Sequence, residues 1–237
     1  MPRSTDRLAA MTHPWNVPFD GYAAPADWNL DAEESREVER IVWGTVLRGE
    51  TEIDSYLWRL EDYLVSEDHP DQGGLTEDQV EAFVSDVVAR RREQQADLGG
   101  APTSALSEAF EELAGIGILG REDFTCCGTC LSAEIFDERD ESRTWRGYLA
   151  YHQQDTDSIA SSGTTYLNYG TFLDAYIPFE EWEPMSDADK ESMYERTTVE
   201  LMREAIPVLE RHGVEVVWDG DLATRILLRN VERFSSV

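Results

Sequence analysis

"GILGREDFTCCGTCLSAEIF", residues 117–136, is the stretch at which the character of this sequence changes. Before it, apolar residues recur at helical spacing, and after it apolar and polar residues alternate as they do in strands. Helices first and a sheet afterwards predict an α+β protein. The same stretch holds Cys126, Cys127 and Cys130, which are all the cysteines of the 237-residue chain.

Four helices are predicted before this stretch, at about 31–49, 53–64, 76–92 and 105–113. Asp31 with Glu34, and Thr76 with Gln79, have the spacing of capping boxes at the starts of the first and third helices. Residues 1–29 contain four prolines and no periodic apolar pattern, which predicts an irregular arm. The glycines of "GIGILG" have the spacing of a dinucleotide fingerprint, but they follow a helix instead of opening one, which argues against that function.

The second half of the chain predicts a mostly antiparallel sheet of four to five strands. Strands are expected at 132–136, 147–154 and 164–171, and a two-strand hairpin is expected within 214–229 around Asp219 and Gly220. A helix at about 187–212 would cover the sheet. We therefore expect an irregular arm over 1–29 and one α+β domain over 30–237. Its helical part, about 30–118, would pack on its sheet part, about 122–235.

The net charge of the chain limits the classes of partner that it can bind. The sequence has 49 acidic and 20 basic residues, giving a formal net charge of −29. Such a field disfavours nucleic acid and anionic membranes and would attract a basic protein partner, although an acidic surface also simply keeps a protein in solution. Because the sequence shows neither a membrane-spanning apolar run nor a signal peptide, we expect a cytoplasmic protein.

The three cysteines are the candidate chemical centre. Thiols in the cytoplasm stay reduced, so these residues are expected to bind a metal, to react, or to pack as small apolar side chains. Cys127 and Cys130 form a CxxC pair, a spacing that suits zinc. The expected metal ligands are Cys126, Cys127, Cys130 and His152, with Asp155 or Glu134 as an acidic alternative that would complete a set of two cysteines and His152. Cys126 can join only if the chain turns there, as Gly128 would permit.

A cysteine-dependent enzyme is the rival interpretation. Cys127 would be the nucleophile, His152 the base and Asp155 the group that orients the ring. Because His152 and Asp155 are three residues apart, they share a face only if the strand ends between them. A thioredoxin-like site fits less well, since it needs a helix after the CxxC pair and "LSAEIF" is expected to be a strand.

Four short motifs resemble the recurring elements of a known family. They are FxCCxxC from Phe124 to Cys130, YHxQD from Tyr151 to Asp155, an aromatic strand ending at Tyr169 and Gly170, and the Trp218-Asp219-Gly220 hairpin. Together they resemble a family of uncharacterised bacterial proteins, mainly actinobacterial, catalogued as a domain of unknown function, over roughly residues 80–230. The resemblance implies a coherent cysteine and histidine centre and no particular activity.

The function expected from these observations is that of a cytoplasmic binding or regulatory protein. Its centre would comprise Cys127, Cys130 and His152 with Cys126, Gln154 and Asp155 nearby, and it would bind a metal, zinc first, or sense redox state through its thiols. The alternatives are the cysteine-dependent enzyme and an acidic immunity or inhibitor protein that binds a basic partner.

Overall fold

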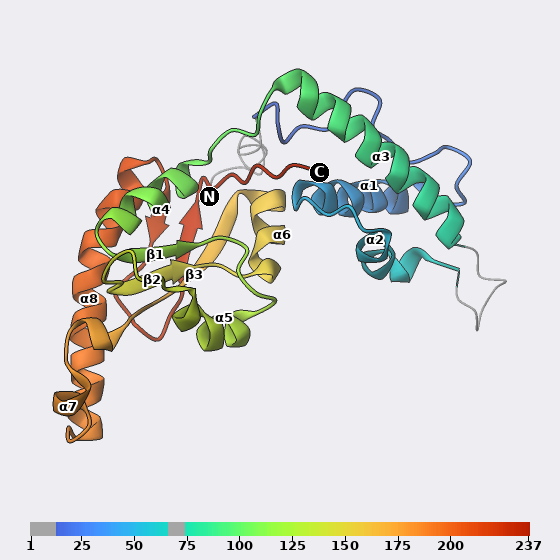
Figure 1. The fold of residues 1–237 in the computed structure, drawn as a ribbon. Coiled ribbons are helices and arrows are strands. Elements are labelled where there is room, and N and C mark those ends of the chain that lie inside the picture. Colours follow the sequence, from blue (N-terminus) through green and yellow to red (C-terminus); the bar gives the residue numbers. More distant parts are fainter. Residues whose placement is uncertain (1–12, 66–73) are drawn as a thin grey trace. The chain divides into compact units, whose positions relative to one another are not determined.

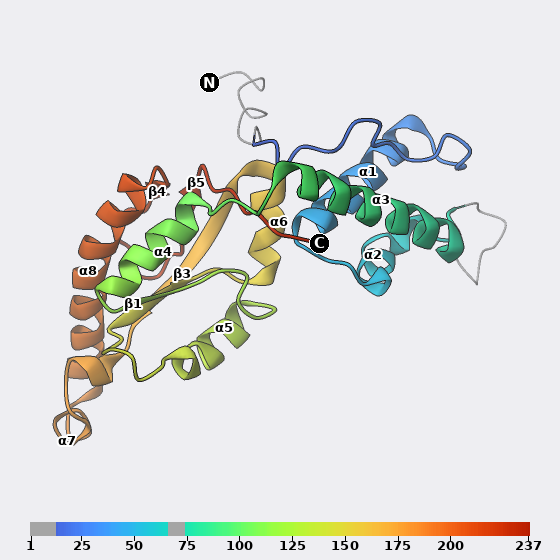
Figure 2. The same ribbon diagram turned by 45° about the horizontal axis from the view of Figure 1, so that its top comes forward.

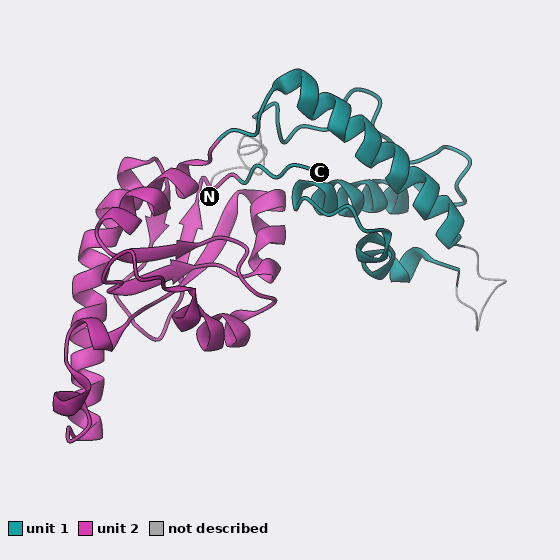
Figure 3. Ribbon diagram, viewed as in Figure 1, with its two compact units in different colours: residues 1–102, 233–237 teal, residues 103–232 magenta. Residues whose placement is uncertain are grey.

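The computed structural model describes residues 13–65 and 74–237 and divides them into two compact units. One unit comprises the described residues up to Pro102 together with Arg233–Val237, and the other comprises Thr103–Glu232 (Figure 3). The sequence predicts a single domain over 30–237, with its helical part ending near 118. In the structure the division falls near 102 instead, so the fourth predicted helix belongs to the unit that contains the sheet.

Unit 1 is built from three α-helices: α1 (Ala32–Leu47), α2 (Ile53–Arg59) and α3 (Glu77–Leu98), with a short 3₁₀ helix at Glu61–Tyr63. Both predicted capping boxes are confirmed, at Asp31 and at Thr76. The described part of the arm, residues 13–29, contains only turns and bends. Its aromatic side chains nevertheless pack on the helices, as Trp28 does against Phe83 at 5.1 Å between ring centroids.

The segment Arg233–Val237 completes unit 1, although it follows the whole of unit 2 in the sequence. The backbone oxygen of Ser235 accepts hydrogen bonds from Gln95 Nε2 at 2.9 Å and from Trp15 Nε1 at 3.3 Å. The amide of Val237 donates to Gln95 Oε1 at 3.1 Å. The arm and α3 are thus hydrogen-bonded to the last residues of the chain.

Unit 2 contains one five-stranded sheet. Its strands are β1 (Ile118–Arg121), β2 (Gly147–Ala150), β3 (Thr164–Thr171), β4 (Glu215–Val217) and β5 (Ile226–Arg229), in the order β1-β2-β3-β5-β4. Its helices are α4 (Ala105–Gly115), α5 (Gly128–Glu134), α6 (Gln153–Ser162), α7 (Phe179–Trp182) and α8 (Asp187–Arg211), with 3₁₀ helices at Ile135–Glu138 and Leu173–Ala175. The predicted α+β class is confirmed.

The sheet is mixed, which corrects the prediction of a mostly antiparallel sheet. β1 and β2 are parallel, whereas β2–β3, β3–β5 and β5–β4 are antiparallel. Parallel neighbours need a long crossover, and residues 122–146, which contain α5, supply it. The hairpin of β4 and β5 is confirmed, but its strands are joined by residues 218–225 and not by a two-residue turn.

The two faces of the sheet are covered by different helices. On one face, α4 and α8 bury an apolar cluster with the strands that includes Phe110, Leu149, Leu167 and Leu201. On the other face, Leu131 and Ile135, from α5 and the 3₁₀ helix after it, pack with Leu119, Ala150 and Phe172. Figures 1 and 2 show α4 and α8 on one side and α5 on the other. Among the described residues, no helix is both long and apolar enough to cross a lipid bilayer.

Candidate functional site

Cys126 and Cys127 lie in the connection between β1 and α5, and Cys130 lies in the first turn of α5. Cys127 is the residue that precedes α5, its backbone is extended (φ −157°, ψ 171°), and its carbonyl oxygen accepts the amide of Leu131 at 2.9 Å. The strand predicted at 132–136 is therefore wrong, because this segment is α5 followed by a 3₁₀ helix. Leu131 and Ile135, both buried, are four residues apart, a spacing that fits one face of a helix as well as one face of a strand.

This helix also removes the argument against a thioredoxin-like placement of the CxxC pair. That argument rested on a strand after Cys130, whereas Cys127 and Cys130 stand at the beginning of a short helix that follows β1. The arrangement brings Cys127 and Cys130 to the same end of α5.

The thiol turn, residues Cys126–Cys130, brings all three sulfur atoms together. The Sγ atoms of Cys126, Cys127 and Cys130 all lie within 4.8 Å of one another. The Cys126 thiol donates to Cys130 Sγ at 3.4 Å. All three thiols are free; Cys126 is exposed, and Cys127 and Cys130 are half-buried. The sulfur atoms thus converge at a place that solvent can reach, which argues against mere packing of small apolar side chains.

The thiols differ in their acidity. The pKa of Cys127 is lowered, first by the backbone amide of Cys130 and then by the neighbouring thiols and the amide of Thr129. The pKa of Cys130 is raised to about 12, first by hydrogen bonding with the sulfur atoms of Cys126 and Cys127 and then by negative charge on these neighbours. Cys127 is therefore the better candidate for a metal ligand or nucleophile near neutral pH.

The turn before the cysteines is made by residues other than glycine. Asp123 and Thr125 have positive φ angles of 54° and 58°, whereas the predicted hinge, Gly128, does not. A β-branched residue in this region is uncommon and strained. The Thr125 hydroxyl donates to the carbonyl oxygens of Phe124 at 2.6 Å and of Cys127 at 3.3 Å, which closes the turn.

Backbone hydrogen bonds hold this turn beside His152. The amide of Phe124 donates to the carbonyl of Tyr151 at 2.9 Å, and the amide of Gln153 donates to the carbonyl of Thr125 at 3.0 Å. His152 lies between the two. The FxCCxxC and YHxQD motifs are thus direct neighbours in the fold.

The sequence predicted His152 on a strand, but in the structure it lies directly before α6. Its Nε2 lies 3.1 Å from Asp155 Oδ2, because Asp155 stands in the first turn of that helix. This is the geometry that the enzyme interpretation requires, with the extended backbone ending between the two residues. Gln154, predicted nearby, is exposed on α6.

Arg225 completes a polar cluster that the sequence analysis missed. Its guanidinium donates from Nη1 to Asp155 Oδ1 at 3.2 Å and from Nη2 to Asp155 Oδ2, and Nη2 also donates to the carbonyl of Tyr166 at 2.5 Å. His152 and Asp155 are only 6% and 7% exposed. Burial lowers the pKa of His152, Asp155 opposes this shift and Arg225 adds to it, so the ring stays neutral at neutral pH.

The histidine lies next to the thiol turn but outside the sulfur cluster. A Cβ placed on Gly128 would stand 3.7 Å from His152 Cδ2 and Nε2, so the ring packs against the backbone of the turn. Over the described residues, however, the candidate metal-binding group contains the three cysteines and neither His152, Asp155 nor Glu134. The structure therefore assembles three of the four expected metal ligands.

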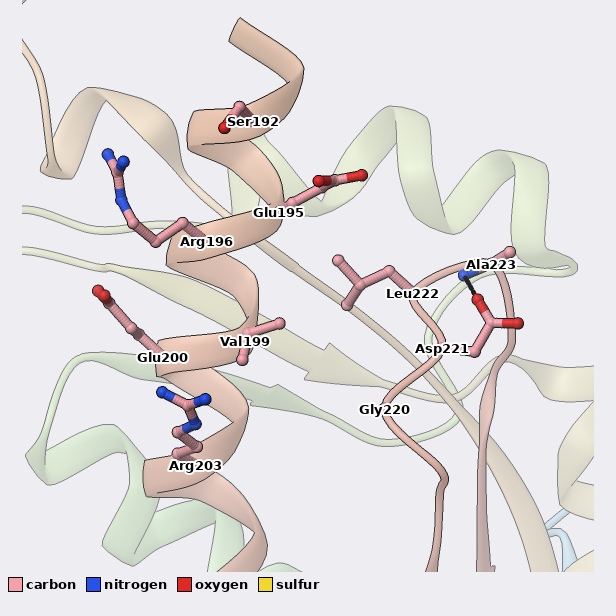
Figure 4. Close-up of a pocket in the computed structure, with 10 residues that line it drawn as sticks. All are labelled: Ser192, Glu195, Arg196, Val199, Glu200, Arg203, Gly220, Asp221, Leu222 and Ala223. Carbon is pink, nitrogen blue, oxygen red and sulfur yellow. Dashed lines mark hydrogen bonds between the residues drawn. The ribbon is translucent and has the colours of Figure 1, made fainter. Parts of the chain in front are cut away.

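A separate groove of about 650 Å³ lies between α8 and residues 220–223. α8 contributes Glu195, Arg196, Glu200 and Arg203, of which Glu195 points towards residues 220–223 (Figure 4). Asp221, on the other side of the groove, accepts the amide of Ala223 at 2.9 Å. No thiol or imidazole lines it. The groove is an ordinary charged surface and is distinct from the predicted centre.

A comparison with protein families identifies the chain. Residues 31–233 match the family model described as a domain of unknown function, DUF6891. The chain belongs to this family. The match confirms the predicted membership of a family of unknown function and begins well before residue 80, where the resemblance was expected to start. No curated protein and no solved structure matches the chain.

Proposed function

We propose that this protein is a binding or regulatory protein that holds one thiophilic metal ion at Cys126, Cys127 and Cys130. The convergence of the three sulfur atoms within 4.8 Å is the observation that supports this function. Two thiolates on one tetrahedral zinc ion stand about 3.8 Å apart. The 3.4 Å between the sulfur atoms of Cys126 and Cys130 is close to that separation.

The donor set also fits the metal. Thiolates select soft or borderline ions such as Zn²⁺ and Cu⁺ over Mg²⁺ and Ca²⁺. Zinc is the ion we expect first, and the reducing cytoplasm is the compartment in which these thiols would be available. The lowered pKa of Cys127 makes its thiolate, the form that binds a metal, easier to reach than that of Cys130.

Metal content tests the proposal. Untagged protein purified under reducing, chelator-free conditions should contain about one equivalent of zinc or copper by mass spectrometry. The triple variant Cys126→Ser, Cys127→Ser and Cys130→Ser should contain none. Thr129→Ala is the matched control, because Thr129 is exposed between the thiols and offers no soft ligand. Wild-type protein that stays metal-free after incubation with Zn²⁺ would contradict the proposal.

Reversible thiol oxidation is the second candidate function. The 3.4 Å sulfur separation and the opposite pKa shifts of Cys127 and Cys130 favour it. Two thiols would be oxidised to a disulfide while an external disulfide, such as oxidised glutathione, is reduced to two thiols. Loss of two free thiols at a defined glutathione ratio, in protein that binds no metal, would support this function.

The remaining alternatives make different demands. A cysteine-dependent enzyme needs His152 to take the proton of Cys127 at Nδ1, because its Nε2 lies against Asp155. In the described part of the chain, Nδ1 is buried and has no hydrogen-bond partner. An acidic inhibitor of a basic protein would keep its binding in the triple Cys→Ser variant and lose it as salt rises. Measured thiol reactivity and salt dependence distinguish both from a metal centre.

A further inference from the structure

The proposed metal centre has three protein ligands and a fourth position to fill. Zinc is almost always four-coordinate, and sites with three protein ligands keep one position for an external group. Over residues 13–65 and 74–237, no histidine, aspartate or glutamate joins the three sulfur atoms. Which group takes the fourth position decides what the site can bind.

His152 is the nearest imidazole, and its own contacts hold it away from this role. Its Nε2 is held by Asp155, whose two carboxylate oxygens are both bound by Arg225. Arg225 is in turn fixed to the carbonyl of Tyr166. Turning the ring towards the thiols would break the contact between Nε2 and Asp155 and leave Arg225 as the partner of a carboxylate that is 7% exposed.

The thiol turn itself is accessible to solvent. Cys126 is exposed, and Cys127 and Cys130 are half-buried. The segment 124–133 carries no charged residue, although 29% of the chain is charged. An incoming anionic ligand would therefore meet no carboxylate from the turn itself.

We infer that the fourth position is filled by the thiolate of a low-molecular-weight thiol, so that Cys126, Cys127 and Cys130 form a thiol-accepting metal site. This inference rests on the proposed metal centre. Soft ions that are already bound by thiolates favour a further sulfur ligand over oxygen ligands. The incoming thiol gives its proton to solvent and its sulfur binds the metal in place of solvent, so no atom is oxidised or reduced.

Cobalt(II) is a suitable probe, because thiolate-to-cobalt charge-transfer absorption reports the number of sulfur ligands. Cobalt-loaded wild-type protein is titrated with 2-mercaptoethanol and, separately, with glutathione. We expect the absorption to grow and to saturate at one thiol per cobalt. His152→Ala and the milder His152→Gln should show the same spectra before and after the thiol is added.

Three results would overturn this inference in distinguishable ways. If neither thiol changes the wild-type spectrum, the bound metal has no position that accepts a thiol. Thiol-free spectra that change in both His152 variants would show that His152 is the fourth ligand. A spectrum that already shows four sulfur ligands, with a doubled mass in gel filtration, would assign the position to a cysteine of a second copy. Failure to bind cobalt at all would instead refute the metal centre itself.

Discussion

The thiol turn and the cluster of His152, Asp155 and Arg225 lie side by side in unit 2, yet their side chains are used in opposite ways. The sulfur atoms have mainly one another as polar partners and face solvent. Asp155, by contrast, is buried, accepts hydrogen bonds from Arg225 and lies 3.1 Å from His152 Nε2. Motifs that are neighbours in a fold therefore need not act as one centre, because a polar group that is fully engaged by the protein is not free for a ligand.

Removing the carboxylate of Asp155 should have the largest effect. Asp155→Asn would leave Arg225 and His152 without their charged partner, and we expect the free energy of unfolding to fall by about 2–3 kcal/mol. This loss is smaller than that expected for a fully buried ion pair, because the Arg225 side chain is 35% exposed. Urea denaturation followed by circular dichroism measures it. Asp137, by contrast, is exposed, and Asp137→Asn should change stability by less than about 0.5 kcal/mol. Equal effects of the two substitutions would show that the cluster is not structural.

The thiol turn should show its own asymmetry in metal-free protein. Cys127, whose pKa is lowered, should react with iodoacetamide at least about tenfold faster than Cys130, whose pKa is raised to about 12. Peptide mapping after a short exposure at pH 7.5 gives the ratio. Equal rates would mean that the pKa values of Cys127 and Cys130 are not shifted in opposite directions. Added zinc should slow the reaction of Cys127.

The pH dependence of stability tests whether His152 is buried and neutral, in contrast to the exposed thiol turn. Its pKa in the folded protein lies below the ordinary value because the ring is buried. The unfolded chain therefore binds the proton more readily, and stability present above about pH 6.5 is lost as pH falls below it. The loss between pH 7.5 and 5.5 should be up to about 1.4 kcal/mol, and His152→Gln should remove that part. A wild-type profile that His152→Gln leaves unchanged would contradict a buried neutral ring.

The smallest effect is expected at the boundary between the two regions. Gly128→Ala places a methyl group 3.7 Å from His152, at ordinary contact distance and without a positive φ. We expect stability within about 0.5 kcal/mol of wild type and unchanged metal content. Gly147→Ala is the matched comparison, because its methyl group would lie 2.4 Å from the carbonyl oxygen of Gly170. Loss of metal from Gly128→Ala alone would mean that His152 and the thiols are closely coupled.

Much of the fold could be predicted from local signals. The capping boxes at Asp31 and Thr76 each place a helix start within a few residues. The errors occurred where two periods coincide, as at Leu131 and Ile135, and where a helix is short and polar, as in α6. The parallel pairing of β1 with β2 depends on the crossover through α5, so the wrong strand there also hid the mixed sheet.

The candidate site was predictable only as far as its motifs reach. The three cysteines are close in sequence, so their convergence needs only a turn and a helix. Arg225 lies 70 residues from Asp155 and has no local pattern that marks it. His152 was expected among the ligands because its predicted strand lies close to the cysteines, whereas in the structure it lies beside Asp155 and outside the sulfur cluster.

Because Arg233–Val237 belongs to unit 1, this unit is completed only after unit 2 has been synthesised. A ribosome makes the three helices of unit 1 first, but Ser235 and Val237, which Gln95 and Trp15 bind, follow only after all of unit 2. Unit 2 is thus inserted within unit 1 in the sequence and has all its strands available earlier. During synthesis the sheet and the thiol turn can therefore fold before the helical unit has received Arg233–Val237.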